Sequence, residues 1–246
     1  MFRNNQKGAA LIVVLIMLVV IAIVGTWAIR SSMTSLNIST NAQAQSLLMQ
    51  NSDSVFYTVE NKTTDDLAFA QMRIGDGFLA YALRPENKGK ELVFCIRGNV
   101  TDNFAGSRIA SAIYWQGTKL VNTELGQNGF CQIDRGDFIS GRQAVMTQVS
   151  VRAADALRDW EHMMEGDDKE SSKSTGVQRV VITATSLLTH LSSASVQQIN
   201  ACLKNYTSFV DEIAENQTVT ECLSELGVPY STQDMEYSLR TLKASL

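Results

Sequence analysis

The residues whose type and spacing indicate chemistry most directly are four cysteines, Cys95, Cys131, Cys202 and Cys222. An even number of cysteines in one part of a chain is typical of disulfides formed in an oxidising compartment. No two of them form a C-x-x-C pair, so a metal site has little support. The sequence alone permits three disulfide pairings.

Among these pairings we favour Cys95 with Cys131 and Cys202 with Cys222. The first disulfide would join two predicted strands. The second would close a C-terminal loop of a length for which chain-entropy estimates give about 3 kcal/mol of stabilisation. Four buried thiols are the alternative, which is weaker if the cysteines lie outside the cytoplasm.

The chain has two histidines, His162 and His190. Neither lies beside a Ser or Cys in a recognisable nucleophile turn, and there is no G-x-S-x-G motif. The glycines within 74–78 and 87–91 match neither a dinucleotide fingerprint nor a phosphate-binding loop. We therefore expect no enzymatic activity and no cofactor.

Three acidic residues, Asp167, Asp168 and Glu170, offer the oxygen ligands that calcium requires. Their spacing matches no defined calcium-binding loop, so a solvated charge run in a mobile loop over 165–176 is the favoured interpretation. The net charge is −4, and the 21 Lys and Arg residues are scattered. Because no basic patch is evident, direct nucleic-acid binding is not predicted.

A long apolar segment precedes all of these residues. Ala9 to Ile29 is a run of 21 residues without a charge, which as a helix would span about 30 Å, the thickness of a bilayer core. Basic residues precede the run, and after Arg30 the next is Lys62. The positive-inside rule therefore places residues 1–8 in the cytoplasm and the body of the chain outside.

This segment does not have the form of a cleaved secretory signal. Its apolar core exceeds the usual length, and Trp27 and Arg30 lie where a small-x-small cleavage site is expected. Two alternatives remain: an ordinary membrane anchor, and a segment that is cut after Gly8 and keeps its apolar run.

The helix is expected to continue to about Glu60, because residues 31–62 contain neither Pro nor Gly. Its larger apolar residues fall mostly on one face, which is typical of a helix that packs against a soluble domain. These residues are Met33, Leu36, Leu47, Leu48, Val55, Phe56 and Val59, with Thr40 and Ala44 in the same stripe.

After Glu60 the pattern changes to short runs typical of β-strands, separated by Gly, Asn and Asp turns. Short strands at close spacing favour an antiparallel sheet, so the predicted fold class is α+β. The predicted strands are 91–97, 108–115, 117–122, 129–133, 144–151 and 179–186, with a turn or two of helix at LAFAQMR.

The chain is thus divided into four regions. They are a leader at 1–8, a membrane helix with an amphipathic continuation at 9–60, a globular body at 61–190 with an inserted helix and loop at 153–177, and a C-terminal region at 191–246. The last region is expected to be helical or irregular and closed by a disulfide, with a break around Gly227 and Pro229.

Residues 1–32, and above all QKGAALIVVLIMLVV, resemble the N-terminus of a type IV pilin precursor. Such precursors carry a short basic leader ending in Gly, then an apolar helix that first anchors the subunit and later packs in the filament core. The opening GAALIVVL is similar to that of minor pilins of the PilX type, the counterparts of K-type pseudopilins in type II secretion. The resemblance implies the type IV pilin fold, with a long N-terminal helix packed on an antiparallel sheet.

The resemblance also implies roles for three residues. Gly8 would be the last leader residue, where the missing side chain lets the prepilin peptidase reach the backbone, and Ala9 would be the N-methylated first residue of the mature chain. Phe is commoner than Ala at that position.

Val13 stands where major pilins carry a glutamate. In filaments such a glutamate is partnered by the N-terminal amine of the subunit above, because an unpartnered carboxylate among apolar helices is costly. Val13 therefore implies a subunit at the tip, with nothing above it. The alternative is that Val13 is one more apolar residue of an anchor helix.

The implied protein is a minor pilin that helps to initiate pilus assembly and forms part of the tip complex, supporting twitching motility, adhesion and DNA uptake. Its implied partners are the prepilin peptidase, other minor pilins and the major pilin through the N-terminal helix, and a pilus tip adhesin. It would lie in the bacterial inner membrane with its body in the periplasm, and then at the pilus tip on the cell surface.

Two other functions are weighed against this one. A type II secretion pseudopilin has a similar N-terminus, but K-type subunits tend to carry a larger insertion than 153–177. A bitopic periplasmic sensor or binding protein is the other alternative, although residues 1–8 are too few for a cytoplasmic signalling domain.

Overall fold

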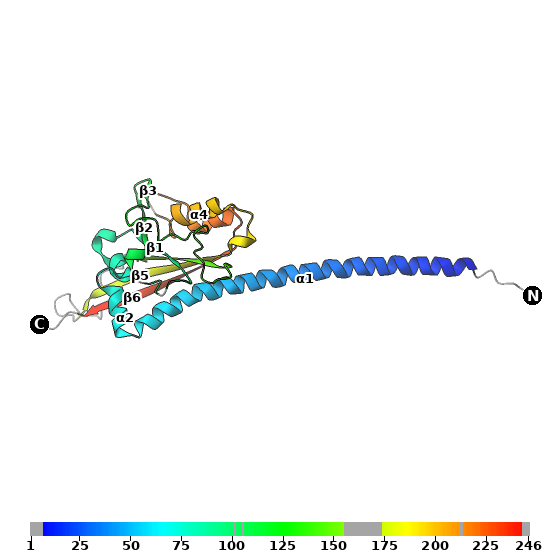
Figure 1. Cartoon of the computed structure of the whole chain (residues 1–246), viewed down its shortest axis with the longest axis horizontal. Coiled ribbons are helices and arrows are strands. Elements are labelled where there is room, and N and C mark those ends of the chain that lie inside the picture. The colour runs from blue at the N-terminus through cyan, green and yellow to red at the C-terminus, as the bar shows by residue number, and fades with distance from the viewer. Residues whose placement is uncertain (1–6, 101, 105, 155–173, 212–213, 243–246) are drawn as a thin grey trace, which may run out of the picture. The chain divides into compact units, whose positions relative to one another are not determined.

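Helix α1 (Lys7–Thr63) is the longest element of the structure, a computed structural model that describes residues 7–100, 102–104, 106–154, 174–211 and 214–242 (Figure 1). The chain divides after Ala44 into two compact units, and α1 contributes residues to both. The second unit combines helices with an antiparallel sheet, which confirms the predicted α+β class.

The composition of α1 accounts for its length. It contains no proline, and its only glycines are Gly8 and Gly25. The helix ends at Thr63, close to the expected end at Glu60. Asp65 then caps the next helix, where its side chain accepts hydrogen bonds from two backbone N–H groups.

The second part of α1, residues 45–63, has the apolar face that the sequence predicts. Leu48, Val55, Phe56 and Val59 are each at most 5% exposed. The prediction is wrong for Leu47, which is 39% exposed because it lies about 100° around the helix from Leu48.

Among the described residues, six strands form one sheet in the order β3-β2-β1-β4-β5-β6, and every neighbouring pair is antiparallel. The strands are β1 (Glu91–Ile96), β2 (Ser111–Gln116), β3 (Lys119–Val121), β4 (Met146–Ala153), β5 (Ser174–Leu187) and β6 (Tyr230–Leu242). Successive residues of β1 and β4 are buried, so both faces of the sheet are covered there.

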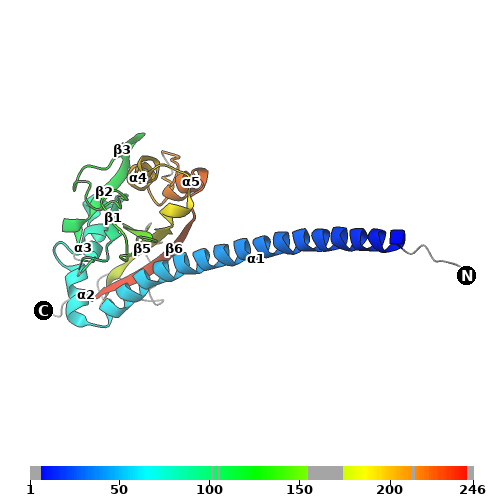
Figure 2. The same cartoon turned by 45° about the vertical axis from the view of Figure 1, so that its right-hand side comes forward.

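Different helices cover the two faces. The second part of α1 lies on one face with α2 (Asp66–Arg73) and α3 (Phe78–Leu83), whereas α4 (Val196–Asn205) and α5 (Val219–Glu225) lie on the other (Figure 1, Figure 2). Short 3-10 turns join some of these elements, namely η1 (Pro85–Asn87), η2 (Ser107–Ile109) and η3 (Thr189–Leu191). The side chains of β4 point alternately to the two faces, so that Val149 packs toward α3 and Met146 packs with α4 and α5.

The expectation of helical or irregular structure throughout 191–246 is wrong for β6. Helices α4 and α5 do form there, but β6 then pairs with β5 over most of its length. Met235, Tyr237 and Leu239 alternate with polar residues and pack on the α1 side of the sheet, which is the period of a strand. The C-terminal region therefore completes the sheet of the body.

The predicted strand at 129–133 is also absent. Its backbone N–H groups bond to side chains, since that of Cys131 donates to Gln148 at 3.1 Å and that of Gln132 donates to Asp137 at 3.0 Å. Most of the predicted insertion at 153–177 lies outside the described residues. Its described ends continue β4 and β5.

Three aromatic rings anchor α3 and the loop after β1 on the sheet. The ring centroids of Phe78 and Phe104 lie 6.2 Å and 5.4 Å from that of Phe94, which is 2% exposed. Ring pairs at these separations add to the stabilisation that burial provides.

Replacement of Phe94 by Ala is expected to lower the free energy of unfolding by about 3–5 kcal/mol, because it leaves a cavity among these rings. Urea unfolding of the full chain in detergent measures this loss. Leu67→Ala is the matched control, because Leu67 is 69% exposed and its truncation should change stability by less than about 0.5 kcal/mol. Equal stability losses in the two variants would contradict the assignment of the core.

Candidate functional site

The first part of α1, residues 7–44, carries an extensive exposed apolar surface. Its large apolar side chains between Leu11 and Ile29 are 50–76% exposed, and they follow one another so closely that they cover every side of the helix. A helix that is apolar all round requires lipid or other helices around it. Among the described residues one helix is long and apolar enough to cross a membrane, which is consistent with a single-pass anchor.

Hydroxyl groups on this part of α1 bond within the helix. Thr26 donates to the Ile23 carbonyl at 2.9 Å, and Thr40 donates to the Leu36 carbonyl at 2.8 Å. Such hydroxyls need no water, so the surface can enter an apolar environment without an unsatisfied donor at these positions.

The N-terminal residues that the pilin resemblance singles out lie at the start of α1. Gly8 and Ala9 are in its first turn, and Val13 is 59% exposed four residues after Ala9. Residues four apart lie on the same helical face. Cleavage after Gly8, methylation of Ala9 and the role of Val13 remain predictions.

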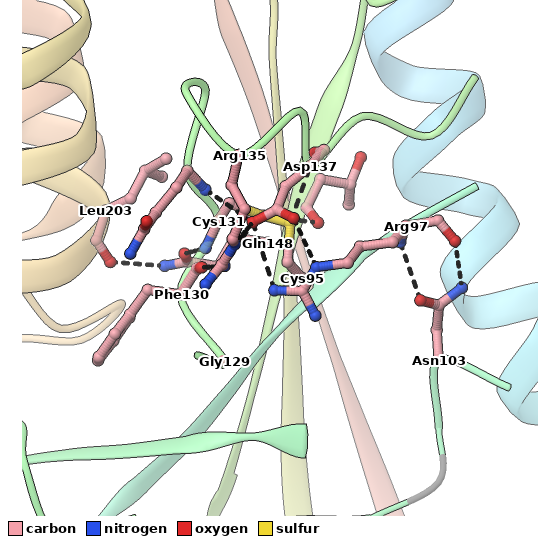
Figure 3. The surroundings of a disulfide bond; sticks show 12 residues. Cys95, Arg97, Asn103, Gly129, Phe130, Cys131, Arg135, Asp137, Gln148 and Leu203 are labelled. Carbon is pink, nitrogen blue, oxygen red and sulfur yellow. Dashed lines mark hydrogen bonds and ion pairs between the residues drawn. A yellow bond between two sulfur atoms is a disulfide. The ribbon is translucent and has the colours of Figure 1, made fainter. Parts of the chain in front are cut away.

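In the second unit, the structure pairs Cys95 of β1 with Cys131, and this is the pairing that the sequence favours. Figure 3 shows Arg97 and Arg135 converging on the carboxylate of Asp137 beside this disulfide. The Nε of Arg97 donates to Asp137 at 2.6 Å, and that of Arg135 donates at 2.9 Å. The network holds the loop that carries Cys131 against β1.

The pKa of Asp137 reflects these contacts. Burial alone would raise it, but hydrogen bonds and charges from Arg97 and Arg135 together outweigh burial and lower the pKa below its ordinary value. The carboxylate is therefore ionised at neutral pH, where it also accepts the backbone N–H of Gln132.

Gly129 lets this loop approach the sheet. A Cβ at this position would lie 2.2 Å from the Ser111 backbone nitrogen and 2.4 Å from the Val93 carbonyl oxygen. No side chain fits at these separations, so glycine is required where the loop crosses β1 and β2 on its way to Cys131.

The second disulfide joins α4 to α5 through Cys202 and Cys222, which is also the pairing that the sequence favours. Each helix begins with a capping box, formed by Ser195 with Gln198 and by Thr218 with Glu221. The disulfide and the caps together fix two short helices, which have few residues with which to stabilise themselves.

Glu91 is a buried acid for which the sequence gives no signal. It is 1% exposed, and its carboxylate accepts hydrogen bonds from the backbone N–H of Ser208, at 2.9 Å, and from the Ser208 hydroxyl. Burial raises the pKa of Glu91, although the hydrogen bonds to its carboxylate and the charge of Arg152 act to lower it. The contact ties the chain after α4 to the first residue of β1.

Of the remaining sequence candidates, the structure places His190 alone. His190 stacks on Phe138 with ring centroids 6.1 Å apart, which is a packing contact. His162 and the acidic cluster of Asp167, Asp168 and Glu170 lie outside the described residues. Within the part of the chain that the structure describes, no group of three or more His, Cys, Asp or Glu side chains could hold a metal.

Comparison with known proteins gives no relative. No protein-family model, curated protein or solved structure matches the chain. The geometry and the sequence therefore carry the functional argument by themselves.

Removal of the second disulfide by Cys202→Ser and Cys222→Ser together should lower the free energy of unfolding by about 3 kcal/mol, because the unfolded chain gains loop entropy. Thermal unfolding of the full chain under oxidising conditions measures the loss. The control is the same measurement after reduction, when the variant and the unchanged chain should become much closer in stability. No difference under oxidising conditions would contradict this pairing.

Replacement of Glu91 by Gln should change the pH dependence of stability. Because the pKa is raised in the folded state, the carboxyl favours folding while protonated, and this advantage is lost as the pH rises above the ordinary value of 4.5. The stability of Glu91→Gln relative to the unchanged chain should therefore increase between about pH 4 and pH 7.

Urea unfolding of both proteins across this pH range is the measurement. Glu225→Gln serves as the control for the same change of side chain at an exposed position. A stability difference for Glu91→Gln that stays constant with pH would show that the buried carboxyl does not titrate as described.

Proposed function

We propose that this chain is a minor type IV pilin of the PilX type, which helps to start pilus assembly at the inner membrane and remains in the tip complex. Its apolar N-terminal helix would lie first in lipid and later among the helices of other pilin subunits. The proposed role is structural and not enzymatic, and it depends on the surfaces that the chain offers to its partners.

The observation that supports the proposal most strongly is that α1 exposes apolar side chains near its start and buries them near its end. One continuous helix, Lys7–Thr63, is apolar on every side from Leu11 to Ile29, whereas Val55, Phe56 and Val59 near its end are buried on an antiparallel sheet. This is the architecture that the pilin resemblance implies. A plain membrane anchor does not require a helix of this length to continue into the core of the domain that it anchors.

The residues at the beginning of the sequence add support. The basic and polar leader ends in Gly8, and small residues follow it at the point where a peptidase would cut. Cleavage there would remove Lys7 and leave an apolar helix that starts at Ala9. Such a segment can leave the bilayer only if protein covers it, because its apolar surface is too large to remain in water.

Val13 supports a place at the tip in preference to the filament shaft. A carboxylate among packed apolar helices needs a partner, and an apolar residue needs none. A subunit with valine here can begin a filament with no subunit above it. Other minor pilins, the major pilin and a tip adhesin are the partners that this position implies.

Immunogold labelling and filament counts test the proposal in cells that produce the full chain. We expect label at filament ends, and severalfold fewer surface filaments in cells that lack the chain. Restoring the full chain should restore the count. Label confined to the inner membrane, together with unchanged filament numbers, would contradict the proposal.

Val13→Glu tests the tip argument separately. The added carboxylate would have no amine to neutralise it at the tip, so we expect severalfold fewer filaments and less label at their ends. Val13→Leu is the matched control, because it keeps the position apolar and should leave both measurements unchanged. Normal counts and tip labelling for Val13→Glu would remove the argument from this position.

A further inference from the structure

Strand β6 forms a long outer edge of the sheet. It is the last strand in the sheet order, and among the described residues no segment pairs with its outer side. The strand contains neither Pro nor Gly in its 13 residues, Tyr230–Leu242. Native proteins usually protect such an edge, because its free N–H and C=O groups can pair with another strand. The opposite edge, β3, has three residues.

The residues of β6 alternate regularly between the two faces. Gln233, Met235 and Tyr237 are half-buried on the side of α1, while the residues between them are exposed. This alternation continues along an edge without an internal bulge from Val177↔Arg240 to Leu187↔Tyr230 in its pairing with β5. A partner strand added here could therefore keep register with β6.

A groove of about 450 Å³ lies between α1 and β6, at this edge. Its lining contains three carboxylates, from Asp53, Glu60 and Asp234, and no basic side chain. No ion pair of these three carboxylates is found among the described residues, and all three side chains are exposed. Burial, together with the charge of Glu60, raises the pKa of Tyr237 to about 12.

Apolar and aromatic side chains also line the groove. Phe56 and Met235 line it, and Tyr57 stands beside them with 69% of its surface exposed. A strand paired with β6 would place alternate side chains over this groove. Apolar stems with a basic end would suit it, because the stem can lie on the aromatic surface while the charge meets a carboxylate.

We propose that the outer edge of β6 accepts an extended strand from a partner protein that carries Lys or Arg at alternating positions. Backbone hydrogen bonds would supply the pairing, and the acidic groove would select the partner. This inference does not depend on the leader, on Val13 or on pilin membership.

A second copy of this chain fits the edge less well. Paired antiparallel in one sheet, the β6 strand of a second copy would place Gln233, Met235 and Tyr237 on the side of this groove, and none of these side chains is basic. Neutral side chains offer no charge to meet the carboxylates. The charge of the groove therefore points to a different, basic strand.

Fluorescence anisotropy with the full chain in detergent tests the proposal. The probe is a labelled nine-residue peptide with alternating lysine and valine. One control peptide has glutamate in place of lysine, and the other has the lysine sequence with every second backbone amide methylated. We expect the lysine peptide to bind and to slow amide hydrogen exchange at 231–239, and each control peptide to bind at least roughly tenfold more weakly.

Protein variants complete the test. Combining Asp53→Asn, Glu60→Gln and Asp234→Asn should weaken binding of the lysine peptide roughly tenfold, whereas Glu225→Gln, which changes an exposed acid outside the groove, should not. Failure of the lysine peptide to bind at millimolar concentration would overturn the proposal, and so would equal binding of either control peptide. Slower exchange at 231–239 on raising the concentration of the chain alone would identify a second copy as the occupant and would also overturn it.

Discussion

The apolar surface on the first part of α1 is the constraint on which the rest of this protein depends. Large apolar side chains cover every side of the helix from Leu11 to Ile29, and water is not a possible final environment for them. Lipid would satisfy this surface in a membrane, and under the proposed function neighbouring helices would replace the lipid in a filament. The hydroxyl of Thr26 bonds back to the helix, so the same segment is compatible with either environment.

The second unit differs from this segment, because it buries its apolar core residues in its own clusters. The sheet is covered on both faces by short helices and by the second part of α1. Two disulfides, the pair of arginines on Asp137 and the buried Glu91 fasten the loops and short helices to this sheet. The polar groups of these contacts bond to one another, which agrees with a structural role for them.

The regular features of the sequence predicted the fold well, and the local exceptions were harder to predict. The membrane-length helix is visible as a continuous apolar run, and most strands are visible as short runs rich in β-branched residues. The four cysteines permit only three disulfide pairings. β6 was missed because its apolar residues, separated by charged ones, also fit an amphipathic helix. The strand expected at 129–133 fails because Gly129 crosses β1 and β2 at a distance that no periodicity reveals. Glu91 had no signal at all, because its burial depends on Ser208, which is distant in the sequence.

The most direct test of the central claim is the mass and N-terminal sequence of the protein recovered from cells with and without the prepilin peptidase. We expect a chain that begins at N-methylated Ala9 only when the peptidase is present, and one that begins at Met1 in its absence. A chain that begins at Met1 in both cells would show that this protein is not processed as a pilin. The apolar helix would then be an ordinary membrane anchor, and the proposed exchange of lipid for neighbouring helices would have no basis.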